Sequence, residues 1–236
     1  GNAAGRVRSI MKDVLNVLFP RRCIFCGEFM KEAGEVCARC NEELPRLQEP
    51  LCELEMGDVE RLYCAFFYDK KMPRGIYQLK FLGKSHIHRW FAGEMVSSMG
   101  DSLLRENIDL VCCVPMHRKR RRKRGYNQAQ LLAKEAAKLL NLPYADCLKK
   151  VKLTEEQHLL SGRERRLKQR DSFASIPLRG ERILLIDDIC TSGETMKECA
   201  RMLKAAGASV VIGAAVCRAS RVPQQPVEAK RKLWYS

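Results

Sequence analysis

The feature that most constrains the fold is one segment in the last quarter of the chain, Ile183-Leu-Leu-Ile-Asp-Asp-Ile-Cys-Thr-Ser-Gly-Glu-Thr195. Its first four residues are apolar and predict a buried strand, two carboxylates follow, and a short loop with hydroxyl groups and a glycine leads into a helix. In open α/β sheets, ligands bind at the carboxyl ends of the strands. The segment therefore predicts an α/β domain with a ligand site at Asp187 and Asp188.

The loop after the two carboxylates has the composition of a phosphate-binding loop. Its backbone N–H groups can surround a phosphate, and the N-terminus of the following helix adds favourable partial charge. The segment lacks the Gly-Lys-Ser/Thr of a P-loop, so a different kind of phosphate cradle is predicted. We expect the phosphate contacts to come from Cys190, Thr191, Ser192, Gly193, Glu194 and Thr195.

The two carboxylates serve another purpose, because they repel a phosphate. They can accept hydrogen bonds from sugar hydroxyls, or hold Mg²⁺ directly or through water. A phosphate at one end of a ligand and vicinal hydroxyls at the other describe a ribose 5-phosphate. The alternative interpretation is a strand that ends in solvated acids before a helix cap. It leaves unexplained why strand, acid pair, hydroxyl loop and helix occur together.

Other parts of the chain predict more strands and helices of the same architecture. Buried-type strands separated by helices imply parallel pairing in a sheet covered on both faces. Strands are expected at residues 62–68, 110–114, 147–153, 183–186 and 209–216, and helices at 6–19, 75–81, 87–105, 126–140 and 195–206. The expected organisation is an amphipathic helix (6–19), a cysteine-rich module with an acidic linker at 49–60 (20–61), the α/β domain (62–218) and a tail (219–236).

Paired cysteines near the N-terminus predict a metal site. Two Cys-x-x-Cys turns can complete a tetrahedral zinc site of four thiolates, which has no open position and is therefore structural. Thioredoxin-like redox chemistry would place one such pair near a βαβ unit, and neither pair is so placed. The expected ligands are Cys23, Cys26, Cys37 and Cys40. We expect the small module to fold only with its metal.

Twelve cysteines in a chain without a recognisable signal peptide favour a reducing compartment, so a cytoplasmic protein is expected. The cysteines in apolar strands, in the loop or in a helix are better explained as small core residues: Cys112, Cys113, Cys190, Cys199 and Cys217. No apolar run approaches the length of about 20 residues that a membrane span needs.

Positive charge gathers in particular places. Lys and Arg number 43 against 28 Asp and Glu, a net charge of +15, which favours anionic partners. Residues 118–124 are seven consecutive cations, Lys149, Lys150 and Lys152 follow, and a third cluster spans 163–170. One diphosphate cannot use seven cations, so part of the run is expected to bind nucleic acid, for which charge density suffices.

Residues 183–195 resemble the phosphoribosyl diphosphate (PRPP) motif of type I phosphoribosyltransferases: four apolar residues, Asp-Asp, two variable residues and Thr-Ser-Gly-x-Thr. The rest of the chain is similar to the competence protein F (ComF/ComFC) family. The similar segments are Val114-Pro…Arg-Gly-Tyr-Asn-Gln128, the spacing of Gln157, Leu160, Arg165 and Phe173, the Lys80-Phe81-x-Gly83 element and the paired cysteines. The chain departs from the family in two places. Lys168 stands where the family has Asn, and Cys52 and Cys64 stand alone where many relatives have further Cys-x-x-Cys pairs.

The resemblance implies a type I phosphoribosyltransferase domain with an N-terminal zinc module. It makes residues 116–126 the loop after the first sheet strand, facing the diphosphate, and makes 154–173 a loop that closes over the substrate. The implied diphosphate and loop residues are Arg118, Arg124, Gly125, Asn127, Gln128, Gln157 and Arg165, with Asp187 and Asp188 as the catalytic pair.

Two functions are compatible with these residues. The first is a Mg²⁺-dependent enzyme that transfers a phosphoribosyl group from PRPP to an unidentified acceptor. The second is a non-catalytic module that binds PRPP or a nucleotide together with single-stranded DNA. The family resemblance implies a role in DNA uptake during natural transformation for either one, with proteins of the competence machinery as partners.

Overall fold

The computed structural model describes residues 21–30, 34–69, 71–81, 85–151 and 172–219. Several predicted features lie outside these described residues. They are the helix at 6–19, Gly83, most of the loop at 154–173 with Gln157 and Arg165, the cluster at 163–170 and the tail from 220 onward. Within the described part of the chain, no helix has the length and apolar character needed to cross a bilayer.

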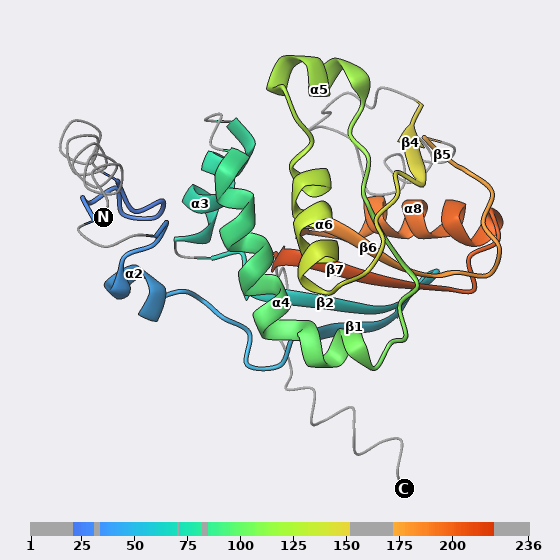
Figure 1. The fold of residues 1–236 in the computed structure, drawn as a ribbon, viewed down its shortest axis with the longest axis horizontal. Helices are drawn as coiled ribbons and strands as arrows, with labels where there is room; N and C mark the ends of the chain where they lie inside the picture. Colours follow the sequence, from blue (N-terminus) through green and yellow to red (C-terminus); the bar gives the residue numbers. More distant parts are fainter. Residues whose placement is uncertain (1–20, 31–33, 70, 82–84, 152–171, 220–236) are drawn as a thin grey trace, which may run out of the picture.

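A five-stranded mixed sheet forms the centre of the molecule (Figure 1). Its order is β1-β2-β7-β6-β3; β2, β7, β6 and β3 are parallel, and β1 pairs antiparallel with β2 at one edge. The strands are β1 (Leu51–Met56), β2 (Val59–Phe67), β3 (Leu110–Cys113), β6 (Arg182–Cys190) and β7 (Val210–Arg218). The predicted parallel α/β sheet is confirmed.

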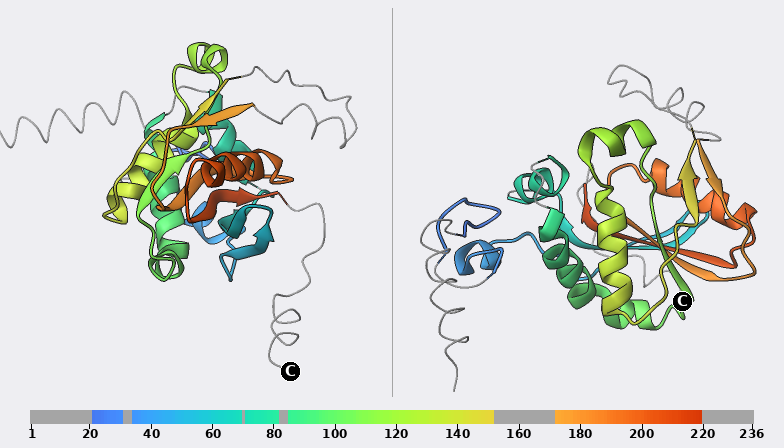
Figure 2. Two further views of the ribbon diagram at one scale, coloured as in Figure 1. Left: turned by 90° about the vertical axis from the view of Figure 1, so that its right-hand side faces the viewer. Right: turned by 45° about the horizontal axis from the view of Figure 1, so that its top comes forward.

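Helices cover both faces of this sheet because its central strands are apolar on both sides. Along β6, Leu184 and Ile186 face the cluster that contains α4 (His88–Leu104) and α6 (Gln128–Leu139). Ile183 and Leu185 face the cluster that contains α8 (Glu194–Ala205). Figure 2 shows α8 on the opposite side of the sheet from α4 and α6. Strands buried on both faces read as continuous apolar runs, as these do.

The acidic linker expected at 49–60 is wrong, because this stretch forms β1 and the start of β2. Its glutamates mark the edge strand of the sheet, where one side of the strand meets water. Glu55 and Gly57 have φ of 53° and 62°, and this left-handed backbone closes the tight hairpin between the two strands. The acidic composition suggested a linker because the local sequence does not reveal that this stretch pairs with β2.

The basic run at 118–124, expected as part of a loop, forms the short helix α5 (Arg118–Arg124). Lys and Arg are good helix formers, and Gly125 ends the helix with φ of 90°. At the far side of α5 lies a second, two-stranded sheet of β4 (Leu148–Lys150) and β5 (Phe173–Ser175). In Figure 1, α5 and this small sheet both stand above the main sheet.

The cysteine-rich module, with α2 (Ala38–Glu42), packs onto the α/β domain through α3 (Met72–Phe81), η1 (Ser85–Ile87) and α4. Phe25 is buried, and its ring centroid lies 5.6 Å from that of Trp90 on α4. A Cβ added at Gly75 of α3 would overlap the Phe25 ring, so only glycine permits this approach. The module therefore shares the main core.

Candidate functional site

Asp187 and Asp188 lie near the carboxyl end of β6, which runs on to Cys190 rather than ending at Ile186 as expected. The Asp188 amide donates to Asp187 Oδ1 at 2.8 Å. Asp188 is buried, at 4% exposure, and Asp187 is half-buried. Burial, and then the charge of Asp188, raises the pKa of the Asp187 carboxyl well above its ordinary range. Two adjacent carboxylates largely kept from water form a site that favours a cation or hydrogen-bond donors.

A cation already reaches this pair from α3. Lys80 Nζ lies 2.5 Å from Asp188 Oδ2, and both side chains are largely buried. In the sequence, Lys80 stood out only as part of the Lys-Phe element, without a role. The missing signal is spatial: the end of α3 meets the end of β6, more than a hundred positions later in the chain.

Of the residues predicted for the diphosphate side, Gln128 contacts the same carboxylate directly and Arg124 reaches it through Gln128. Gln128 Nε2, at the start of α6, donates to Asp188 Oδ1 at 3.4 Å. Arg124 Nη1 in turn donates to Gln128 Oε1 at 2.6 Å. Arg124, Gln128, Asp188 and Lys80 thus form one connected polar network. Arg118, at the other end of α5, is exposed, and no described contact joins it to the network.

Asn127 and Gly125 shape the backbone beside this network. Asn127 is buried and caps α6 by accepting from the Ala129 amide at 3.2 Å, while its Nδ2 donates to Val114 O at 3.1 Å. The side chain therefore fastens the end of β3 to the start of α6. Gly125 supplies the left-handed residue between α5 and α6. Both residues therefore fix the backbone on which Arg124 and Gln128 stand.

The predicted phosphate loop joins β6 to α8. Thr191 and Ser192 are exposed, Gly193 and Cys190 are buried, and Glu194 and Thr195 start the helix. Gly193 has φ of 77°, and a Cβ there would overlap Met56 Sδ of β1. A glycine is therefore required twice over, by its backbone and by its neighbour. The thiol of Cys190 points inward, and burial raises its pKa to about 11.

Arg218, the last residue of β7, binds this loop through hydrogen bonds. Its Nη1 donates to Thr191 O at 3.0 Å and to Cys190 Sγ at 3.1 Å. Its Nη2 pairs with Glu53 Oε2 of β1 at 2.8 Å. Arg218, Glu53 and Met56 were not predicted from the sequence. The only available signal was that Arg218 follows a predicted strand, whose carboxyl end must lie at the ligand edge of the sheet.

Further positive charge borders the site from the β4–β5 sheet. Lys150 on β4 is partly buried, and its ammonium lies 5.1 Å from the Phe173 ring centroid. Burial, and then the charge of Arg120 on α5, lowers the pKa of Lys150, while Asp187 acts in the opposite direction. Lys150 is therefore close enough to Asp187 on one side and to Arg120 on the other to interact electrostatically with both.

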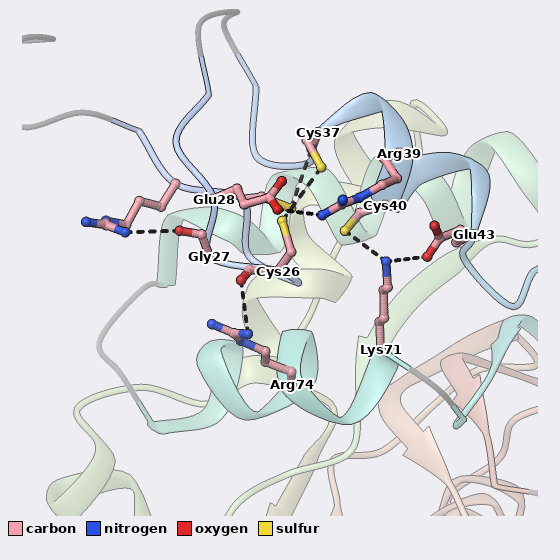
Figure 3. Close-up of polar contacts among 11 residues, drawn as sticks. Cys26, Gly27, Glu28, Cys37, Arg39, Cys40, Glu43, Lys71 and Arg74 are labelled. Atoms are coloured by element: carbon pink, nitrogen blue, oxygen red, sulfur yellow. Dashed lines mark hydrogen bonds and ion pairs between the residues drawn. The ribbon is translucent and has the colours of Figure 1, made fainter.

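The four predicted zinc ligands come together in the N-terminal module (Figure 3). Their sulfur atoms all lie within 4.8 Å of one another, and Cys26 Sγ is 3.8 Å from Cys37 Sγ. Four thiolates bound to zinc at about 2.3 Å stand about 3.8 Å apart in a tetrahedron, so the donor set fits zinc. The ligands are Cys23, Cys26, Cys37 and Cys40.

Charged neighbours support this cluster. Lys71 Nζ donates to Cys40 Sγ at 3.3 Å and pairs with Glu43, and the Cys37 amide donates to Cys23 Sγ at 3.5 Å. Such contacts favour thiolate over thiol, the form that binds metal. The core assignment of Cys112, Cys113, Cys190, Cys199 and Cys217 is confirmed, because all five are buried. Cys52 and Cys64 lie in β1 and β2, away from the zinc cluster.

Comparison with known protein families supports both the zinc-binding module and the phosphoribosyltransferase domain. Residues 14–58 match the family described as Double zinc ribbon domain, and residues 126–235 match the Phosphoribosyl transferase domain. DNA utilization protein YhgH of Escherichia coli O157:H7 is 27% identical over 213 residues, which cover 83% of this chain and 89% of that protein.

Two competence proteins are also similar. Competence protein F of Haemophilus influenzae is 25% identical over 193 residues, covering 78% of this chain and 79% of that protein. Competence protein ComFC of Bacillus subtilis is 27% identical over 183 residues, covering 77% and 70%. The resemblance to the competence protein F family is confirmed, as is a phosphoribosyltransferase domain behind a zinc-binding module.

Proposed function

We propose that this homologue of competence protein F, which joins a zinc ribbon to a phosphoribosyltransferase domain, binds PRPP at the end of β6 and transfers its phosphoribosyl group to an acceptor. The observation that supports this most directly is the convergence of Lys80, Gln128 and Asp188 beside the loop at Gly193. A ribose phosphate needs hydrogen-bond acceptors for its hydroxyls and a cradle for its phosphate, and the two stand next to each other here.

Each part of the site has a distinct role in this proposal. The backbone of the loop and the hydroxyls of Thr191 and Ser192 bind the 5-phosphate at the N-terminus of α8. Asp187 and Asp188 accept hydrogen bonds from the ribose hydroxyls. The same two carboxylates would hold Mg²⁺, which supplies charge neutralisation of the diphosphate when it is bound.

The transfer itself breaks the bond between C1 of the ribose and the diphosphate oxygen. The bonding electrons leave with the diphosphate, and C1 accepts an electron pair from the acceptor. Negative charge grows on the leaving diphosphate, and in this proposal Arg124 stabilises that charge. Lys80 pairs with Asp188 and so reduces the negative charge that an incoming diphosphate meets.

Calorimetry with PRPP and Mg²⁺ tests the proposal. We expect specific binding by the wild type and its loss in Asp187→Asn/Asp188→Asn. A matched control, Glu42→Gln/Asp101→Asn, removes two exposed carboxylates far from β6 and should bind as the wild type does. Equal binding by the wild type and the Asp187/Asp188 variant would contradict a phosphoribosyl site at this place.

A second candidate function, nucleic-acid binding, is favoured by α5. Its seven residues are all cationic, and none is buried. The relatives named for DNA utilization and competence add weight to a role in DNA uptake. We expect affinity for single-stranded DNA to fall steeply with salt, and the slope to decrease when residues 118–123 are neutralised. An unchanged slope would remove α5 from this function.

A further inference from the structure

Exposed aromatic side chains are found on α3 and in the adjoining zinc module. Four aromatic residues in the described part of the chain are strongly exposed, and three of them lie on α3 or on the adjoining zinc module: Phe29 (60%), Tyr77 (53%) and Phe81 (57%). The fourth is Tyr68 (36%). Large exposed aromatic groups are costly in water, and their clustering marks an interaction surface.

Tyr77 and Phe81 form a pair on the outer face of α3. Their ring centroids are 5.0 Å apart, with an angle of 38° between the ring planes. The Arg124 guanidinium lies 4.7 Å from the Phe81 centroid, and Arg124 belongs to α5. The neighbouring Lys80 turns inward to Asp188. The aromatic pair therefore lies beside the polar network of Lys80, Arg124, Gln128 and Asp188.

The same face of α3 continues to the zinc module. Arg74, three residues before Tyr77, is exposed and its Nη1 donates to Cys26 O at 3.2 Å (Figure 3). Arg22 Nη1 donates to the next carbonyl, that of Gly27, at 3.1 Å. The Arg22 guanidinium also lies 3.8 Å from the Phe29 ring centroid.

These contacts define an arginine–aromatic strip that runs from the zinc module along α3 to α5. Its members are Phe29, Arg22, Arg74, Tyr77, Phe81 and Arg124. Glu28 is the acidic residue nearest in sequence to Phe29, and it is paired with Arg39 at 2.6 Å. The strip carries three arginines, Arg22, Arg74 and Arg124, with exposed aromatic rings between them.

We propose that this strip binds single-stranded nucleic acid by stacking unpaired bases on Phe29, Tyr77 and Phe81 while arginines contact the phosphates. Proteins that bind single strands combine cationic grooves with aromatic platforms, because every base has a π-face. A duplex hides those faces and offers only its backbone. The strip thus selects for single strands, and its end beside Asp188 directs a strand terminus towards the ribose-phosphate site.

This inference rests on the nucleic-acid part of the proposed function, and one experiment separates the two. Fluorescence anisotropy of the full zinc-loaded chain is measured with labelled oligo-dT of about 20 nucleotides and with a duplex of equal length, over a range of salt. Tyr77→Ala/Phe81→Ala should bind the single strand about tenfold more weakly, with an unchanged salt slope and little effect on the duplex.

Two matched variants control for folding and for loss of exposed apolar surface. Leu104→Ala/Leu139→Ala removes side chains that are 69% and 48% exposed on other helices, and should bind as the wild type does. Tyr77→Phe/Phe81→Tyr keeps both rings and should retain affinity. Phe29→Ala should weaken single-strand binding with zinc content unchanged, which tests the far end of the strip.

The inference is overturned if the Tyr77/Phe81 variant, with wild-type thermal stability, binds oligo-dT normally or loses duplex affinity equally. It is also overturned if the wild type does not bind the single strand. PRPP calorimetry is judged independently, so a strip that fails leaves the ribose-phosphate site standing. A salt slope unaffected by neutralising 118–123 removes α5 but not the strip.

Discussion

Lys80 and Asp188 form a largely buried ion pair of 2.5 Å that joins the end of α3 to the end of β6. The two residues are far apart in the sequence, and Lys80 belongs to a helix whereas Asp188 belongs to the central sheet. Because the pair forms one wall of the candidate site, its loss should change both the stability of the fold and the charge of the site.

Lys80→Met should destabilise the protein by about 2 kcal/mol, because it leaves a buried carboxylate without its cation. Urea unfolding measures this loss. The double variant Lys80→Met/Asp188→Asn should be more stable than Lys80→Met alone, because no unpaired charge remains. The single variant Asp188→Asn completes the double-mutant cycle, and strictly additive effects would show that the pair contributes no coupling energy.

The raised pKa of Asp187 makes stability depend on pH. Its pKa in the folded state lies above the ordinary value of 3.8, so between these two values the folded protein holds more protons than the unfolded chain. Stability therefore falls as pH rises through this window. Asp187→Asn should stabilise the ligand-free protein at about pH 8, and the gain should shrink at about pH 5. Urea unfolding at both pH values compares the two proteins; a gain independent of pH would contradict burial as the cause.

Gly193→Ala should damage the phosphate loop more than the fold. The φ of 77° strains any residue with a Cβ by about 1–2 kcal/mol. The close approach of Met56 adds to this strain. PRPP affinity, measured by calorimetry, should fall by about tenfold or more, which corresponds to about 1.4 kcal/mol. Met56→Ala should restore part of the loss by making room, and no restoration would leave the backbone strain as the whole cause.

Arg218 is expected to position the phosphate loop without touching the ligand. Arg218→Lys keeps the charge but cannot reach Thr191 O and Glu53 together, because the planar fork is lost. PRPP affinity should fall about fivefold, while Glu53→Gln, which keeps an acceptor, should have a smaller effect. Equal thermal stability with reduced affinity would distinguish positioning from a purely structural role.

Removal of zinc should change the packing around Trp90. The Trp90 ring lies 5.6 Å from that of Phe25, which is anchored between Cys23 and Cys26. A chelator should lower the melting temperature and change the near-ultraviolet circular dichroism of Trp90. Cys52→Ser, outside the four-cysteine cluster, should keep both zinc and the Trp90 signal. An unaltered signal after measured loss of zinc would contradict metal-dependent docking.

The features that could be predicted from the sequence are those whose determinants are local. The segment from Ile183 to Thr195 contains strand, acids, loop and helix in order, and the four zinc ligands stand in two Cys-x-x-Cys pairs. The residues that escaped prediction act across the chain. Lys80 meets Asp188, and Arg218 meets Glu53, only after the sheet has formed. The strand at 51–56 was missed for the same reason, since its composition is acidic and its pairing is tertiary.

The helix α3 connects the zinc module to the acid pair of β6, two sites that lie far apart in the sequence. At Gly75 it receives the Phe25 ring from the zinc module, and at Lys80 it sends an ammonium group to Asp188. Five residues of helix span only about 7.5 Å, so the two contacts share one rigid segment. If zinc, by fixing α3, strengthens the binding of a ribose phosphate at Asp188, then a bound ribose phosphate strengthens the binding of zinc by the same factor.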